Sequence, residues 1–110
     1  MTLNEYQALA ERTINPHLGV HEMLMHGVFG LAAEAGEVAG IYQKEYQGHL
    51  ATDEALIKEL GDVLWMVAEI CTARDIPMDA VALANIEKLR KRYPDGFSSD
   101  RSIHRAEGDA

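Results

Sequence analysis

The sequence predicts an all-α fold with four main helices, two of them long. Through most of the 110 residues, hydrophobic side chains recur at intervals of three and four positions, the spacing that places them on one face of a helix. Glycine and proline gather where this periodicity breaks. No segment of useful length alternates apolar and polar residues as a half-buried strand does.

The first helix is expected at residues 3–14. Thr2 followed by Glu5 has the form of a capping box, in which each residue satisfies a free backbone N–H of the other. Asn15, Pro16 and Gly19 then interrupt the helical pattern.

The second and third helices are predicted to be long antiparallel neighbours, because a short connection joins them. The second runs from about residue 21 to 46, and the third begins after Thr52 or Asp53, either of which can cap it. Their apolar stripes consist of Val28, Leu31, Ala35, Val38 and Tyr42 on one helix and of Leu56, Leu60, Val63, Val67 and Ile70 on the other.

A fourth helix is expected from Pro77, which suits a first helical turn, to about Arg92. The stretch YPDGF is a turn signal, and the residues after it are polar. We therefore expect one domain at residues 1–97, followed by a polar tail at residues 98–110.

Composition limits the kinds of partner. The formal charge of −8 disfavours non-specific binding to nucleic acid or to an anionic membrane, both of which attract basic surfaces. The single cysteine, Cys71, excludes an internal disulfide and favours a reducing compartment. The N-terminus does not resemble a signal peptide, and no apolar run approaches the roughly 20 residues of a membrane span. A cytoplasmic protein is the expectation.

Two pairs of acidic residues stand out on the long helices. Glu34 and Glu37 are three positions apart, as are Glu59 and Asp62, and residues at that spacing differ by only about 60° around a helix. Each acid directly precedes a residue of an apolar stripe, so each pair lies at the edge of the stripe. If the helices pack antiparallel along these stripes, the two pairs converge.

Converging carboxylates repel one another, and a bound cation is the natural way to stabilise them. Oxygen ligands favour Mg²⁺, with Mn²⁺ as a substitute, and Mg²⁺ commonly takes phosphate oxygens as further ligands. Gly36 and Gly61 lie within the two pairs and are expected to let the helix backbones approach closely. The alternative is that the acids are ordinary solvated residues of a helix surface.

Histidine contributes no clear metal motif. His21 and His26 are five positions apart, which separates them by about 140° around a helix. They do not match the H-E-x-x-H zinc motif, and we interpret them as surface or packing residues.

The fourth helix offers a candidate phosphate clamp. Asn85 stands where an apolar residue is expected, so it should be partly buried with specific partners. Lys88 and Arg92 follow on the same face, and lysine and arginine are suited to bind phosphate. The alternative is that they are exposed basic residues near a helix C-terminus, where the dipole favours them.

Three segments together resemble a known family. GLAAEAGEV, KELGDVLW and ANIEKLRKRYPDGF, in this order, are similar to the MazG-like branch of the all-α nucleoside triphosphate pyrophosphohydrolases. The signature of that family is E-x-x-E, a variable spacer and E-x-x-D, and the spacer here covers residues 38–58. The resemblance extends from about LNEYQ to YPDGF, nearly the whole chain.

The resemblance implies a four-helix MazG-like bundle that is completed by oligomerisation, as a homodimer or a homotetramer. It implies Mg²⁺ bound by Glu34, Glu37, Glu59 and Asp62, and hydrolysis of a nucleoside or deoxynucleoside triphosphate to the monophosphate and pyrophosphate. Water would attack the α-phosphorus, and the reaction would serve nucleotide pool control or the removal of abnormal nucleotides. The residues implied to contact the phosphate chain are Asn85, Lys88, Arg92 and Tyr93.

Two roles are less closely defined by the sequence. Glu37 or Glu34 is expected to orient or deprotonate the attacking water. Trp65 lies three positions after Asp62 and could stack on the base, although a lone tryptophan in a helix is more often part of the core. The general layout of the family places Gln7 and Thr13 at the rim of the base pocket.

Two other functions are compatible with the same residues. One is a helical dimerisation or regulatory module without catalysis, in which the acids form a structural cation site or a surface. The other is hydrolysis of a different pyrophosphate compound, such as an alarmone. The base, the sugar, the number of metal ions, and the choice between dimer and tetramer stay open at this stage.

Overall fold

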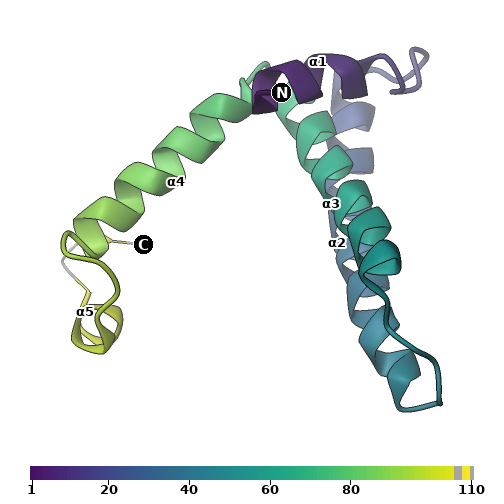
Figure 1. The fold of residues 1–110 in the computed structure, drawn as a ribbon. Coiled ribbons are helices and arrows are strands. Elements are labelled where there is room, and N and C mark those ends of the chain that lie inside the picture. The colour runs from purple at the N-terminus through teal and green to yellow at the C-terminus, as the bar shows by residue number, and fades with distance from the viewer. Residues whose placement is uncertain (106–107, 110) are drawn as a thin grey trace.

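The computed structural model describes residues 1–105 and 108–109. These residues form five helices (Figure 1): α1 Leu3–Glu11, α2 Val20–Glu45, α3 Asp53–Ala73, α4 Met78–Arg92 and α5 Ser99–Ile103. The all-α prediction is confirmed. Helix α5 is a short addition within the predicted polar tail. Residues 106, 107 and 110 of that tail lie outside the described part of the chain. Among the described residues there is no strand, only an isolated bridge between Pro94 and Gly96.

Local capping explains where α1 and α3 begin. The Glu5 backbone N–H donates to Thr2 Oγ1 over 3.0 Å, and the Thr2 N–H donates to Glu5 Oε1 over 3.3 Å, so the predicted capping box is present. Thr52, rather than Asp53, caps α3 by accepting from the Ala55 N–H over 3.1 Å. These side chains satisfy N–H groups that the first helical turn leaves free.

The two long helices α2 and α3 pack side by side and antiparallel (Figure 1). A Cβ atom at Gly27 would lie 2.8 Å from Ile70 Cγ1, and one at Gly30 would overlap the Met66 side chain. Glycine at these two positions lets the helices approach closely. The prediction that Gly36 and Gly61 do so is wrong for this chain, because a Cβ atom at either would meet no atom within 4 Å.

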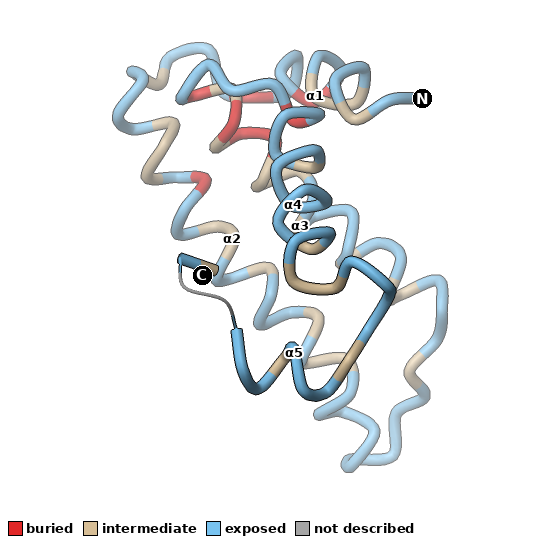
Figure 2. Tube along the Cα trace, turned by 90° about the vertical axis from the view of Figure 1, so that its left-hand side faces the viewer, coloured by how far each residue is buried: buried red, intermediate tan, exposed pale blue. Residues whose placement is uncertain are grey.

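The hydrophobic core is small and lies at the end of the α2–α3 pair that α1 covers (Figure 2). Its buried hydrophobic residues are Ala10, Ile14, Ala68, Cys71, Ala73 and Met78. Trp65 and Tyr6 are partly buried and pack against this core. The other end of the pair, toward the α2–α3 connection, has few buried residues.

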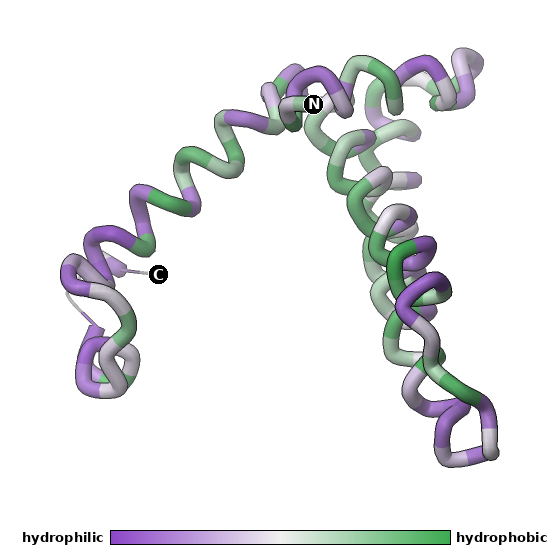
Figure 3. The backbone as a smooth tube through the Cα atoms, in the orientation of Figure 1, coloured by the Kyte–Doolittle hydropathy of each residue, from purple (hydrophilic) through white to green (hydrophobic). Residues whose placement is uncertain are grey.

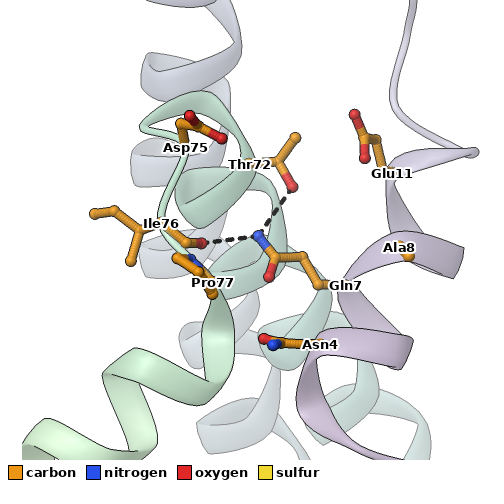
Figure 4. A pocket seen from close by; sticks show the side chains of 8 residues that line it. All are labelled: Asn4, Gln7, Ala8, Glu11, Thr72, Asp75, Ile76 and Pro77. Carbon is orange, nitrogen blue, oxygen red and sulfur yellow. Dashed lines mark hydrogen bonds between the residues drawn. The ribbon is translucent and has the colours of Figure 1, made fainter.

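Gln7 fastens α1 to the turn between α3 and α4. Its amide nitrogen donates to the Ile76 carbonyl over 2.9 Å and to Thr72 Oγ1 over 3.4 Å (Figure 4). Its amide oxygen accepts from the Met78 N–H over 2.8 Å. An open pocket of about 300 Å³ lies beside these contacts.

Helix α4 begins at this junction and leads away from α2 and α3 (Figure 1). It contacts α1, where the Asp79 N–H donates to Asn4 Oδ1 over 2.9 Å. Hydrophobic residues occupy its middle, and its C-terminal end is hydrophilic (Figure 3). A single chain therefore leaves the fourth helix splayed instead of closing a bundle. Within the described residues, no helix is both long and apolar enough to cross a membrane.

Candidate metal and nucleotide site

Three carboxylates converge between the long helices. Glu34 of α2 and Glu59 and Asp62 of α3 each present an oxygen, and these oxygens all lie within 4.8 Å of one another. The antiparallel register that sets Gly30 against Met66 also sets Glu34 against the first half of α3. Glu34 and Glu59 are partly buried and Asp62 is exposed, so the cluster opens to solvent on one side.

The electrostatics of the cluster favour a cation. Burial raises the pKa of Glu34, and the negative charges of Asp62, Glu59 and Glu37 raise it further. In the described part of the chain, none of the three clustered carboxylates forms an ion pair with a basic side chain. Burial and the charge of Asp62 also raise the pKa of Tyr6 on α1, which favours the protonated phenol. A hard divalent cation fits this set of oxygen ligands.

Glu37, the fourth predicted ligand, lies outside the cluster. It is exposed on α2, one helical turn beyond Glu34. Its charge still acts on Glu34, so it lies near the cluster without joining it. The structure thus brings together three of the four predicted ligands.

Two of the residues predicted to contact the base lie together. Trp65 Nε1 donates to Thr13 Oγ1 over 2.8 Å, which joins α3 to the link between α1 and α2. Gln7 does not join them, because both ends of its amide hold the α3–α4 turn. The pocket that Gln7 lines includes none of the clustered acids.

The predicted phosphate clamp is far from the acids within one chain. Asn85 is exposed, so the expectation that it is partly buried is wrong. Lys88 is exposed as well, and the part of α4 that carries both residues leads away from α2 and α3 (Figure 1). Arg92 donates to both carboxylate oxygens of Asp109 over 2.8 and 2.7 Å, and its guanidinium lies 5.9 Å from the centre of the Tyr93 ring.

One pair of polar residues escaped the sequence reasoning. His26, interpreted as a surface or packing residue, places Nδ1 2.7 Å from Glu69 Oε1, and the Glu69 side chain is only 1% exposed. The His26 ring meets the Trp65 ring edge to face, with centroids 6.4 Å apart. Glu69 follows Asp62 by seven positions within the apolar run WMVAEIC. An acidic residue within an apolar run was the sequence signal that could have indicated a buried carboxylate with a specific partner.

The fold and the site together define a class: a helical protein with a cluster of carboxylates between two long antiparallel helices. Residues 21–97 match the MazG nucleotide pyrophosphohydrolase domain, and the chain belongs to this family. The chain is also similar to the Gene 37 protein of Mycobacterium phage L5, with 32% identity over 93 residues that cover 80% of this chain and 76% of that protein. No solved structure shows a significant match to the chain.

The extent of the family match is informative about the site. It includes the clustered acids, Trp65 and the whole of α4. It leaves out residues 1–20, which carry Gln7 and Thr13. The acids and α4 therefore lie within the matched range, whereas Gln7 and Thr13 lie outside it.

Proposed function

We propose that the protein is a Mg²⁺-dependent hydrolase that converts nucleoside or deoxynucleoside triphosphates to monophosphates and pyrophosphate. Such an activity serves nucleotide pool control or the removal of abnormal nucleotides. The observation that carries the proposal is the convergence of Glu34, Glu59 and Asp62 in a chain of the MazG family.

Glu34, Glu59 and Asp62 are the residues that hold Mg²⁺ in this proposal. Their oxygens are close enough to share one ion, and burial together with the neighbouring negative charges raises the pKa of Glu34, which a bound cation would counter. When bound, Mg²⁺ supplies charge neutralisation of the phosphates and a lowered pKa for coordinated water.

Glu37 is the preferred group for orienting the attacking water, with Glu34 as the alternative. Glu37 lies beside the cluster but outside the set of converging oxygens. A carboxylate that is not a full ligand keeps an oxygen free to accept a proton from water. The water attacks the α-phosphorus, and pyrophosphate leaves.

The phosphate clamp acts across subunits. Asn85, Lys88 and Arg92 belong to a part of α4 that leads away from the acids of its own chain (Figure 1), and Tyr93 directly follows that helix. In a homodimer, or in a tetramer built from such dimers, α4 of one copy brings these residues to the acids of the other. Basic residues of α4 then meet an acidic cluster, which is a complementary pairing.

Exposed hydrophobic surface supports this assembly. On α3, Ile57, Leu60 and Leu64 share one face, and Ile57 is 68% exposed. On α4, Val81, Leu83 and Ile86 are also exposed. Leu83 and Ile86 of α4 are three positions apart and share a face, and exposed apolar patches of this kind mark interaction surfaces. A second copy of the chain is the partner that would cover them.

The base lies next to Trp65 and Thr13. Trp65 follows Asp62 by one helical turn, so the base would lie on the side of the site toward α1. The partly exposed indole offers a surface for stacking, and its hydrogen bond to Thr13 holds the ring in place.

A panel of nucleoside and deoxynucleoside triphosphates with Mg²⁺ tests the function. We expect pyrophosphate in amounts equal to the monophosphate formed, and its loss in Asp62→Asn and Glu37→Gln. Glu87→Gln, an exposed acid on α4, is the matched control and should act like the wild type. If the wild type releases no pyrophosphate, or if Asp62→Asn and Glu37→Gln both match it, the non-catalytic module is the better account. Orthophosphate as the first product would instead indicate a different hydrolase.

A further inference from the structure

Glu69 is the largest fully buried side chain among the described residues, and it is ionisable. Its Oε1 meets His26 Nδ1 at 2.7 Å, while its Oε2 has no hydrogen-bond partner in the described part of the chain. Buried carboxylate oxygens without partners are rare and costly, and they commonly have a functional reason. Replacing a buried ion pair with well-packed apolar residues is often neutral or stabilising, so packing alone does not call for an acid here.

The backbone around Glu69 is shaped to admit it. A Cβ atom at Gly27 would lie 3.2 Å from Glu69 Oε1 and 2.8 Å from Ile70 Cγ1. Any larger residue at Gly27 would therefore press on the carboxylate that holds His26. The absence of a side chain at Gly27 thus leaves the space that the Glu69 carboxylate occupies beside His26.

The contact with Glu69 determines what His26 presents to solvent. The His26 side chain is 54% exposed. One side of the ring contacts the buried Glu69, and the exposed part of the ring is open to solvent. With the proton on Nδ1 and donated to the carboxylate, Nε2 of the neutral imidazole is a hydrogen-bond acceptor. The Glu69 contact selects this tautomer of the neutral ring, and it is the form for which the inference below is made.

His26 lies on the same side of the helix pair as the acids. Trp65 follows Asp62 by three positions and Glu69 follows it by seven, so all three share one side of α3. Helical rise places Glu69 about 10 Å from Asp62 along that helix. This separation is comparable with the reach of a nucleotide from its phosphates to its base. The half-exposed His26 ring, which meets the partly exposed Trp65 ring, thus lies within reach of a base whose phosphates lie at the acids.

We propose that His26, held by Glu69, is a specificity residue that accepts a hydrogen bond from the exocyclic amino group of a cytosine or adenine base. The inference depends on the proposed function for the position of the phosphates. Glu69 is a positioning residue, since it acts through His26. A base that carries a carbonyl at the same place would set two acceptors against each other and bind more weakly.

Binding of non-hydrolysable analogues tests the inference without turnover. The probes are the α,β-imido analogues of dCTP and dUTP, and of dATP and dITP, titrated calorimetrically with Mg²⁺ present. In at least one pair, the wild type should bind the amino-bearing member tenfold or more tightly than the carbonyl-bearing member. Equal binding within both pairs, a preference for the carbonyl bases, or no binding of any analogue would overturn the proposal. Absence of hydrolysis alongside a clear amino preference would instead remove only the proposed catalysis.

Variants separate a recognition role from a structural one. His26→Phe keeps an aromatic ring against Trp65 but removes Nε2, and should reduce the amino-to-carbonyl ratio to about one. Glu69→Gln keeps the volume but can donate to Nδ1 and shift the ring proton to Nε2, so it should reduce or invert the ratio. His21→Phe, an exposed histidine on the same helix, is the control and should leave the ratio unchanged. An unaltered ratio in His26→Phe would refute the role of His26 even if Glu69→Gln failed to fold.

Discussion

Glu34 on α2 and Asp62 on α3 present carboxylate oxygens within 4.8 Å of each other, with Glu59 completing the group. A divalent cation bound only to the folded chain stabilises it in proportion to the logarithm of its concentration. Mg²⁺ at about one hundred times its Kd should stabilise the fold by about 2.7 kcal/mol. Thermal unfolding across a Mg²⁺ titration measures this effect. Asp62→Asn should weaken the apparent affinity at least tenfold, whereas the exposed Glu87→Gln should not.

The cluster should also make the metal-free protein sensitive to pH. The pKa of Glu34 in the folded chain is raised above its ordinary value of 4.5 by burial and by the neighbouring carboxylates. Between these two pKa values the folded chain binds more protons than the unfolded chain, so the free energy of unfolding decreases as pH rises through this window. Urea unfolding at a series of pH values should show this decrease in the wild type, and Glu34→Gln should reduce it. A wild-type slope that Glu34→Gln leaves unchanged would contradict a raised pKa for Glu34 in the folded chain.

The starts of α1 and α3 could be predicted because their causes are local, whereas α1 ends at Glu11 and not at the predicted residue 14. Thr2 and Glu5 cap α1, and Thr52 caps α3, through contacts with residues three positions away. The convergence of the acidic pairs could be predicted from the helical period and from the short connection that makes the two helices antiparallel. The role of the glycines could not be predicted, because it depends on the register of α2 against α3. That register sets Gly27 and Gly30, and not Gly36 and Gly61, against the facing helix.

The direction of α4 and the His26–Glu69 contact depend on tertiary structure. Asp75 adopts a positive φ of 55° in the turn before α4, and Gln7, far away in sequence, fastens that turn. Neither the Asp75 conformation nor the Gln7 contacts have a sequence signal strong enough to show that α4 leads away from α2 and α3. His26 and Glu69 are 43 positions apart, so only the packed helices reveal their contact.

Substitutions at the glycines should have opposite effects on stability. Gly27→Ala forces a methyl group against Ile70 and Glu69 and should destabilise the chain by about 1–3 kcal/mol. Gly40→Ala on the same helix meets no atom within 4 Å and should stabilise it by about 0.5–1 kcal/mol. Chemical denaturation of both variants gives the comparison. Equal effects at the two sites would contradict the register described for α2 and α3.

Subunit mixing tests whether α4 acts on the acids of a second chain. Asp62→Asn and Lys88→Ala should each be inactive as pure preparations. If the clamp acts across subunits, a mixed dimer contains one site with neither substitution, and mixing should restore activity. If the clamp acts within a chain, every site in the mixture carries a substitution and no activity returns.

The apolar faces of α3 and α4 should determine the oligomeric state. Leu60→Asp on α3 and Ile86→Asp on α4 place a charge in surfaces that the proposed assembly buries, and each should shift the protein toward monomer. Leu50→Asp, at a residue that is 82% exposed in the α2–α3 connection, is the control and should leave the assembly unchanged. Sedimentation velocity measures the outcome, and a wild-type protein that is already monomeric would contradict the assembly.

Hydrolysis in ¹⁸O-labelled water tests the central claim most directly, because it shows both the products and the phosphorus that water attacks. With a deoxynucleoside triphosphate and Mg²⁺, we expect mass spectrometry to find the label in the monophosphate and unlabelled pyrophosphate, with neither product formed by Asp62→Asn. Label in pyrophosphate, orthophosphate as the first product, or the same products from Asp62→Asn would contradict water attack at the α-phosphorus supported by these acids.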